Sequence, residues 1–431
     1  MTLAIALGVL MSTAAATPSL GQRMDQRIDD AAARVEQKVI ACRRDIHEHP
    51  ELGNREMRTA KLIADRLREL GIEVKENVAH TGVVGLLRGG KPGRVVGLRA
   101  DMDALPVTEQ VDLPFASKVR TTYNGQEVGV MHACGHDAHV AILLGVAEVL
   151  SGIRDQLSGT VKFLFQPAEE GAPQGEEGGA ELMVKEGALE NPKVDAVFGL
   201  HVTSRYPVGE IAYKPEGMMA AVDSFKIIVK GKQTHGAYPW LGVDPIVVAS
   251  QIVLGLQTIP SRQVDSTLAP SVVTVGAIHG GVRNNIIPDS VEMIGTIRSL
   301  DAKMRDDIHA RIKRTVENIA ASAGATAELT ITTGYPITYN DPTLTEKMAP
   351  TLRRVAGSSN VRVVNATLGA EDFSFFQQKV PGLFFWLGTR PKNQTAEEAA
   401  SNHSPLFYVD ESGLGLGVRA MAHVAVDYLR Q

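Results

Sequence analysis

Hydrophobic residues recur with two periods along the chain, and the two periods predict different elements. Residues 24–70 repeat with a helical period of about 3.6 residues, apart from a break at His49-Pro50, where proline interrupts the helix. After residue 80, short apolar runs typical of strands alternate with helical stretches such as 140–150 and 179–186. The expected strands span residues 83–87, 95–98, 161–165 and 196–200. This alternation predicts an α/β fold built on a mostly parallel sheet.

The pattern changes between residues 217 and 332. Residues 224–229 alternate between apolar and polar positions, as half-buried strands do, and the complete order of elements is β-α-β-β-α-β. Helices are expected at 244–258 and 304–322, and further strands at 271–278, 290–299 and 327–332. This order predicts a small two-layer α+β domain of the ferredoxin-like type.

After this segment the α/β pattern resumes and continues to the end of the chain. Strand-like runs at 361–364 and 384–387 precede a last helix at 413–429. We therefore predict that residues 217–332 form a domain inserted into a larger one, which consists of residues 24–216 and 333–431. The length of 431 residues also favours two domains over one.

Composition and charge narrow the class of protein. The chain is 44% hydrophobic and 22% charged, as globular proteins are, and its net charge of −5 argues against a nucleic-acid partner. Residues 1–16 differ, because an apolar run at 3–11 precedes Ala14-Ala15-Ala16, which is typical of a signal peptide. We expect export to a bacterial periplasm or medium, with a cytoplasmic protein as the alternative. No later segment is long and apolar enough to predict a membrane span.

The segment from Met131 to His139 is the most informative part of the sequence. Cys134 and His136 flank a glycine just before a predicted helix, so a tight loop can direct both side chains at one metal ion. The spacing is not that of a standard zinc motif, and two alternatives stay open. One is a His-rich helix start capped by Asp137. The other is a disulfide between Cys42 and Cys134, which would remove Cys134 as a ligand.

Polar residues at the ends of several predicted strands support the metal site. Catalytic groups in α/β sheets lie at the carboxyl ends of strands, and the predicted strands here are followed by polar clusters. These are Asp101 with Asp103, Glu169 with Glu170, and the single His201, while Asn402-His403-Ser404 comes late in the chain. Each cluster alone is more typical of a helix start or a surface histidine. Their placement at one edge of the same sheet favours a shared metal site.

Six motifs together resemble those of the aminoacylase/carboxypeptidase-type metallopeptidases. The similarity is greatest to the branch of hippurate hydrolases, N-acyl-amino-acid amidohydrolases and indole-acetyl-amino-acid hydrolases, and it extends from about residue 30 to the end. The motifs are Arg44-Asp45-Ile46-His47-Glu48-His49-Pro50-Glu51, Arg99-Ala100-Asp101-Met102-Asp103-Ala104-Leu105-Pro106, His132-Ala133-Cys134-Gly135-His136-Asp137, Gln166-Pro167-Ala168-Glu169-Glu170-Gly171, Gly199-Leu200-His201 and Asn402-His403-Ser404.

The resemblance implies a catalytic domain with two divalent metal ions, which could be manganese, zinc, nickel or cobalt. The ligands that it implies are Cys134, His136, Glu170, His201 and His403. Glu169 matches the general base, which takes a proton from a metal-bound water and passes it to the leaving amine. We expect Asp103 to support a ligand by hydrogen bonding, and Asp101 and His139 to be structural.

The same resemblance assigns roles to the inserted domain. His235 resembles a residue that reaches the active site of a partner subunit and stabilises the oxyanion, which implies a homodimer formed through this domain. Asn285 and Arg298 resemble residues that bind the free carboxylate of the substrate. The implied activity is hydrolysis of the amide bond of N-acyl amino acids with hippurate-like, acetyl or aryl-acyl groups. The alternatives are a dipeptidase or carboxypeptidase and, more remotely, an inactive binding protein.

Overall fold

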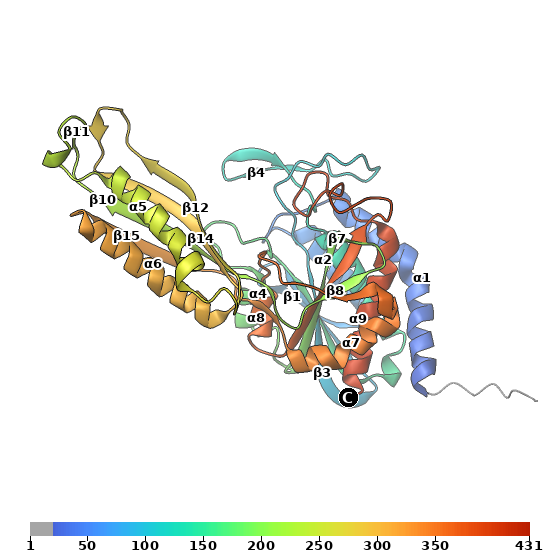
Figure 1. Cartoon of the computed structure of the whole chain (residues 1–431). Helices are drawn as coiled ribbons and strands as arrows, with labels where there is room; N and C mark the ends of the chain where they lie inside the picture. The colour runs from blue at the N-terminus through green and yellow to red at the C-terminus, as the bar shows by residue number, and fades with distance from the viewer. Residues whose placement is uncertain (1–19) are drawn as a thin grey trace, which may run out of the picture.

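The computed structural model describes residues 20–431, which form a large body and a smaller, elongated one (Figure 1). The large body is built on an eight-stranded sheet with the strand order β1-β2-β6-β3-β7-β18-β8-β17. The strands are β1 (Glu73–Val78), β2 (Gly82–Arg88), β3 (Lys91–Asp101), β6 (Ser158–Gln166), β7 (Ala196–Pro207), β8 (Ile211–Tyr213), β17 (Val361–Val363) and β18 (Gly382–Arg390). The predicted α/β class is confirmed.

The centre of the large sheet is parallel, whereas its flanks are mixed. Strands β6, β3, β7 and β18 are consecutive neighbours and all run in the same direction. β1 and β2 join one side as antiparallel strands, and β8 pairs antiparallel with β18 on the other. The carboxyl ends of β3, β6 and β7 therefore meet at one edge, which is where an α/β sheet places its site.

Helices cover both faces of the large sheet. Strand residues alternate between two cores: Phe163 and Phe165 face one, and Leu164 between them faces the other. The first core is covered by α1 (Leu20–Glu48), α2 (Met57–Glu69), α3 (His136–Ser151), α7 (Pro342–Ala356) and α9 (Leu414–Leu429). The second is covered by α4 (Gly179–Lys185) and α8 (Ser374–Gln377). Nearly all of α3 is buried, which explains its apolar sequence on every side.

The smaller body has its own sheet and its own core. Its elements follow the predicted β-α-β-β-α-β order, with two helices packed on a four-stranded antiparallel sheet of order β12-β14-β10-β15 (Figure 1). They are β10 (Ala221–Lys230), α5 (Pro245–Thr258), β12 (Ser271–Gly280), β14 (Ser290–Ser299), α6 (Ala302–Ser322) and β15 (Thr326–Thr333). A short pair, β11 (Thr234–His235) and β13 (Ile286–Ile287), lies at the far tip. The limits 217 and 332 remain predictions for this domain.

The hydrophobic pattern missed several short or exposed strands, among them β1, a hairpin and a further pair of short strands. β1 was overlooked because most of its residues are exposed. The hairpin of β4 (Arg120–Tyr123) and β5 (Gln126–Gly129) turns at Asn124-Gly125, where both residues have positive φ, and this dipeptide is itself a hairpin signal. β9 (Glu216–Met219) and β16 (Thr338–Asn340) pair where the chain enters and leaves the smaller body.

Two further expectations concern the signal peptide and membrane-spanning segments. The predicted signal peptide, residues 1–16, lies outside the described residues. Among the helices of residues 20–431, none combines the length and the apolar character needed to cross a membrane.

Candidate metal centre and active site

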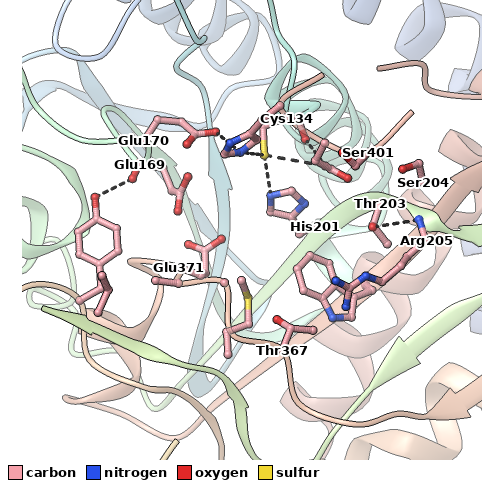
Figure 2. A pocket seen from close by; sticks show the side chains of 18 of the residues that line it. Cys134, Glu169, Glu170, His201, Thr203, Ser204, Arg205, Thr367, Glu371 and Ser401 are labelled. Carbon is pink, nitrogen blue, oxygen red and sulfur yellow. Dashed lines mark hydrogen bonds and ion pairs between the residues drawn. The ribbon is translucent and has the colours of Figure 1, made fainter. Parts of the chain in front are cut away.

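A cavity of about 660 Å³ opens at the carboxyl edge of the large sheet (Figure 2). It is lined by four of the five predicted metal ligands, Cys134, Glu170, His201 and His403, and by the predicted base Glu169. The fifth ligand, His136, is fully buried directly behind this wall, with its Nε2 atom 3.8 Å from Glu169 and 4.0 Å from Glu170. The structure therefore brings together residues that are up to 269 positions apart in the chain.

Gly135 makes the tight loop between Cys134 and His136 sterically feasible. Its φ is 91°, in the left-handed region, and a Cβ atom there would lie 2.3 Å from a methyl group of Val202. α3 begins at His136, so the loop presents Cys134 and His136 from the start of a buried helix. The predicted tight turn around glycine thus follows from both backbone conformation and packing.

Asp137 does not cap this helix, and that alternative is wrong. The residue before the helix is Gly135, and no side chain accepts a capping hydrogen bond. The carboxylate of Asp137 instead accepts a hydrogen bond from Arg43 Nε (2.7 Å) and is hydrogen-bonded to His47 Nδ1 (2.8 Å). A buried carboxylate needs such partners, and these ones tie the helix start to α1.

Cys134 lies at the centre of the ligand set. Its sulfur is 3.4 Å from His201 Nε2 and 3.3 Å from His403 Nε2. Two ligands bound tetrahedrally to one zinc-like ion at the usual sulfur and nitrogen distances lie about 3.5 Å apart, so this spacing suits a shared ion. Cys134 belongs to one possible ligand group with His136 and His201 and to another with Glu170 and His403. The two groups that share this thiol suit two adjacent ions.

The atoms of the candidate ligands have few partners within the protein. His136 Nε2 is buried and makes no hydrogen bond, although polar atoms in protein interiors are nearly always paired, and the buried Glu170 Oε1 has His403 Nε2 3.1 Å away as an ion-pair partner. Burial raises the pKa of the Cys134 thiol well above its usual value, and Glu170 and Glu169 raise it further. A thiolate at this position therefore requires a bound cation. These donors fit a pair of divalent ions.

A second layer of side chains orients the ligands. His136 Nδ1 is 3.1 Å from Asp103 Oδ1, and the other oxygen of Asp103 accepts a hydrogen bond from the backbone N–H of Glu170. Asp103 thus fixes the position of one ligand ring and one ligand backbone, as expected of a supporting carboxylate. Asp101 binds the ring of His139, whose other nitrogen accepts from the backbone N–H of Val202. These contacts agree with the structural role expected of Asp101 and His139.

Glu169 follows a residue with unfavourable backbone geometry. Ala168 has a φ of 51°, and His403 on the other side of the site has a φ of 71°, both rare for residues other than glycine.

Burial raises the pKa of Glu169 well above its usual value, and the nearby carboxylates of Glu371 and Glu170 raise it further. In the metal-free protein this carboxyl therefore favours its protonated form, and added positive charge would lower its pKa.

A buried ionic cluster below Glu169 was missed by the sequence analysis. The guanidinium of Arg99 is fully buried and pairs with Asp101, with Glu371 (2.8 Å) and with Asp372 (3.0 Å). Asp372 also accepts hydrogen bonds from Gln166 Nε2, so the cluster fastens the end of β6 just before Glu169. Arg99 and Gln166 stand in recognised motifs. Glu371 and Asp372 lie in a loop that carries no local signal of this contact.

The predicted substrate residues of the smaller body are not all at this cavity. Arg298 lines the cavity, and its half-buried guanidinium makes no ion pair with any of residues 20–431. His235 and Asn285 do not line it: they lie together at the far tip of the smaller body and are exposed (Figure 1). Of the three predicted substrate residues, only Arg298 therefore lies at the cavity.

The two cysteines are both free, so the predicted alternative of a Cys42–Cys134 disulfide is wrong. Cys42 lies on α1, where burial raises the pKa of its thiol to about 12. Cys134 lies in the cavity wall with its sulfur directed at two histidines. Cys134 therefore remains available as a ligand.

The chain resembles known proteins along most of its length. The model of Peptidase family M20/M25/M40 matches residues 97–427. "Thermostable carboxypeptidase 2" of Saccharolobus solfataricus is 45% identical over 94% of this chain and 98% of its own length. "N-acetylcysteine deacetylase" of Bacillus subtilis is 40% identical over 90% of this chain and 96% of its own length.

A solved structure supports the same assignment. The crystal structure of a dinuclear metal-binding peptidase of the M20 family from Bacillus subtilis is 37% identical and superposes with a TM-score of 0.77. It covers 92% of this chain and 99% of its own. Together with the clustered ligands, these matches show that the chain belongs to Peptidase family M20/M25/M40 and is a metal-dependent hydrolase that binds two divalent metal ions.

Proposed function

We propose that the protein hydrolyses the amide bond of N-acyl amino acids, with Cys134, His136, Glu170, His201 and His403 holding the two ions and Glu169 as general base. One observation carries this proposal. Glu169, a carboxylate that belongs to neither of the two ligand groups that contain Cys134, lines the same cavity as the candidate ligands, and so does the unpaired Arg298. Such a cavity offers a place for a scissile carbonyl and for a free carboxylate.

The residues divide the chemistry between them. When bound, the two ions polarise the substrate carbonyl and lower the pKa of an attacking water. Glu169 is adjacent to the ligand Glu170 and takes the proton of the water, then delivers it to the nitrogen of the leaving amino acid. Tyr335 donates a hydrogen bond from its hydroxyl to the backbone carbonyl of Glu169 (2.8 Å), which holds this residue in place.

Arg298 is the residue that we assign to the free carboxylate of the amino acid. Burial lowers the pKa of its guanidinium, and among residues 20–431 no carboxylate offsets this cost. A substrate carboxylate would supply the missing counter-charge through a bidentate contact. The neutral form remains negligible, because arginine has a very high intrinsic pKa.

We propose a homodimer in which His235 and Asn285 of one subunit complete the site of the other. Large apolar side chains are exposed close to these residues in the chain: Trp240 is 74% exposed, Leu241 57% and Val282 95%. An apolar patch of this kind on a soluble protein is typical of an interface. The His235 ring, held near Tyr238 at the tip, would donate to the developing oxyanion.

A second candidate is a carboxypeptidase or dipeptidase acting by the same chemistry. The similarity to "Thermostable carboxypeptidase 2" favours it, and a free carboxylate at Arg298 suits both activities. An inactive binding protein is the remote alternative. A panel of N-acetyl, N-benzoyl and indole-acetyl amino acids against dipeptides, each with manganese, zinc, nickel or cobalt, separates the three. The proposal expects kcat/KM for the best N-acyl amino acid to exceed that for every dipeptide by at least about tenfold, and faster dipeptide cleavage would contradict it.

We also propose that the protein is exported. The support is the apolar run at residues 3–11 and the Ala14-Ala15-Ala16 sequence. Expression of the full chain in a bacterium, followed by mass determination of the periplasmic fraction, is expected to give a product cleaved after Ala16. An uncleaved chain in the cytoplasmic fraction would contradict export.

A further inference from the structure

A second unpaired cation, Arg205, lines the same cavity as Arg298. Its backbone N–H donates to Thr203 Oγ1 (3.2 Å), but its guanidinium forms no ion pair or side-chain hydrogen bond with any of residues 20–431. The acid that follows in the same segment, Glu210, is bound by Arg362 at 2.6 Å. Arg205 is thus an exposed charge at a cavity wall without a protein partner.

Arg205 lies on β7, the strand that also carries His201. The pairing of β7 with β18 shifts register after Thr203, so simple alternation ends there, and the consecutive residues Thr203, Ser204 and Arg205 all line the cavity together with His201. The Cα atoms of His201 and Arg205 are at most about 13 Å apart, the length of a fully regular strand at about 3.3 Å per residue. The arginine side chain covers part of that distance. The remaining gap suits an acyl group of a few carbon atoms.

Arg298 approaches the cavity from the opposite side. It pairs across the small sheet with Val222, whose N–H donates to the carbonyl of Tyr335, and the hydroxyl of Tyr335 donates to Glu169. Figure 2 shows Glu169 and Arg205 on opposite sides of the cavity, with His201 between them. The strand of Arg298 is thus connected to the Glu169 side of the cavity, and Arg205 lies on the side opposite Glu169.

We propose that Arg205 binds a second carboxylate, located at the far end of the acyl group, so that the substrate class is amino acids acylated by short dicarboxylic acids such as succinate or glutarate. This inference rests on the proposed function, in which Arg298 takes the carboxylate of the amino acid. With that end fixed on the Glu169 side, the acyl group extends past the metals toward Arg205. The neighbouring Ser204 also lines this side of the cavity and supplies a hydroxyl for the same carboxylate.

The reaction is an ordinary hydrolysis and needs no other reactant. The bond between the acyl carbon and the nitrogen breaks, and the oxygen of water joins the acyl carbon. One proton of that water goes to the leaving nitrogen. The products are a free amino acid and a dicarboxylate.

The test compares N-succinyl-leucine with N-butyryl-leucine, which has an acyl chain of the same length but no second charge. For the full-length, metal-loaded protein we expect kcat/KM to favour the succinyl substrate by about tenfold, the value of a hydrogen-bonded charge pair. Arg205→Gln should bring the ratio close to one and change the butyryl rate by less than about twofold. Arg205→Lys should keep part of the preference, and Arg362→Gln, an arginine outside the cavity, should keep all of it.

Two results would overturn the inference. One is a wild-type protein without preference for the succinyl group, or a preference that survives Arg205→Gln. The other is a dependence on Arg205 for N-acetyl-aspartate against N-acetyl-asparagine, which would place the second carboxylate on the amino acid side chain. In both cases hydrolysis of N-butyryl-leucine would leave the proposed function standing, whereas inactivity on every N-acyl amino acid would refute both.

Discussion

The carboxyl edge of the large sheet and the tip of the small body both carry polar residues, but only the first is complete within one chain. At the sheet edge, His136 is fully buried and Cys134 is 7% exposed, and their neighbours fix them by hydrogen bonds. At the tip, His235 is exposed beside Tyr238 and belongs to a two-residue strand pair. A site positioned by core packing is preorganised, whereas the exposed residues of the tip are not held by a core.

The largest effect is expected from a change at the sheet edge. Glu169→Gln removes the proposed base but keeps a side chain of the same size, so kcat should fall by about a thousandfold or more. The metal content, measured by elemental analysis of the purified protein, should stay at two ions. Glu48→Gln, at an exposed glutamate on α1, is the control and should retain full activity. Loss of metal together with activity would instead make Glu169 a ligand.

The next effect tests whether the tip acts on a second subunit. His235→Ala should lower kcat by about a hundredfold, the value of a lost oxyanion donor. When this variant is mixed with Glu169→Gln and the subunits exchange, about a quarter of the sites in a symmetric dimer regain both residues. Activity of the mixture should therefore rise to about a quarter of the wild-type rate. A mixture as inactive as its components would contradict a shared site.

The metal centre should bind its ions more tightly as the pH rises. Burial lowers the pKa of His136, but the charges of Asp101 and Asp103 outweigh this and raise it to about 10 in the metal-free protein. Because a ligand must release its proton, apparent affinity should increase up to about tenfold per pH unit for each proton displaced, from about pH 7 to about pH 10. Calorimetry in two buffers of different ionisation enthalpy counts these protons, and zero release would be inconsistent with these ligands.

The smallest effect concerns the stability of the small body. The carboxylate of Asp223 is buried and accepts hydrogen bonds from Arg305 Nε (2.8 Å) and the backbone N–H of Gly334 (3.0 Å), and it lies 2.7 Å from His309 Nε2. Asp223→Asn should lower the free energy of unfolding in urea by about 2 kcal/mol at neutral pH. Asp307→Asn, which breaks an exposed pair with Arg311, is the control and should cost less than about 0.5 kcal/mol.

The sign of the pH dependence at Asp223 checks the same contact. Burial raises its pKa, but the hydrogen bonds from Arg305 and His309 outweigh this and lower it below the unfolded value. The stabilisation is therefore present above about pH 4, the unfolded pKa, and is lost as the pH falls through the folded pKa. The wild type and Asp223→Asn should differ less in stability at low pH than at neutral pH.

Most of the fold could be predicted because it depends on local periodicity. Buried strands such as β6 and helices such as α3 carry their apolar pattern in consecutive residues, and so does the change of pattern in the small body. β1 was missed because its exposed residues carry no such pattern. The Cys134–His136 loop was recognised because three neighbouring residues hold both the ligand types and the required glycine.

The sequence by itself therefore determined the class of fold and the chemical identity of the candidate ligands, because both depend on patterns within short segments. Only the tertiary structure decided which distant groups meet: it buried Glu371 and Asp372 against Arg99, placed Arg205 and Arg298 on one cavity, and separated His235 from it. These contacts join segments far apart in the chain. No local pattern encodes them, because their energy arises from charges that meet only when the sheet has formed.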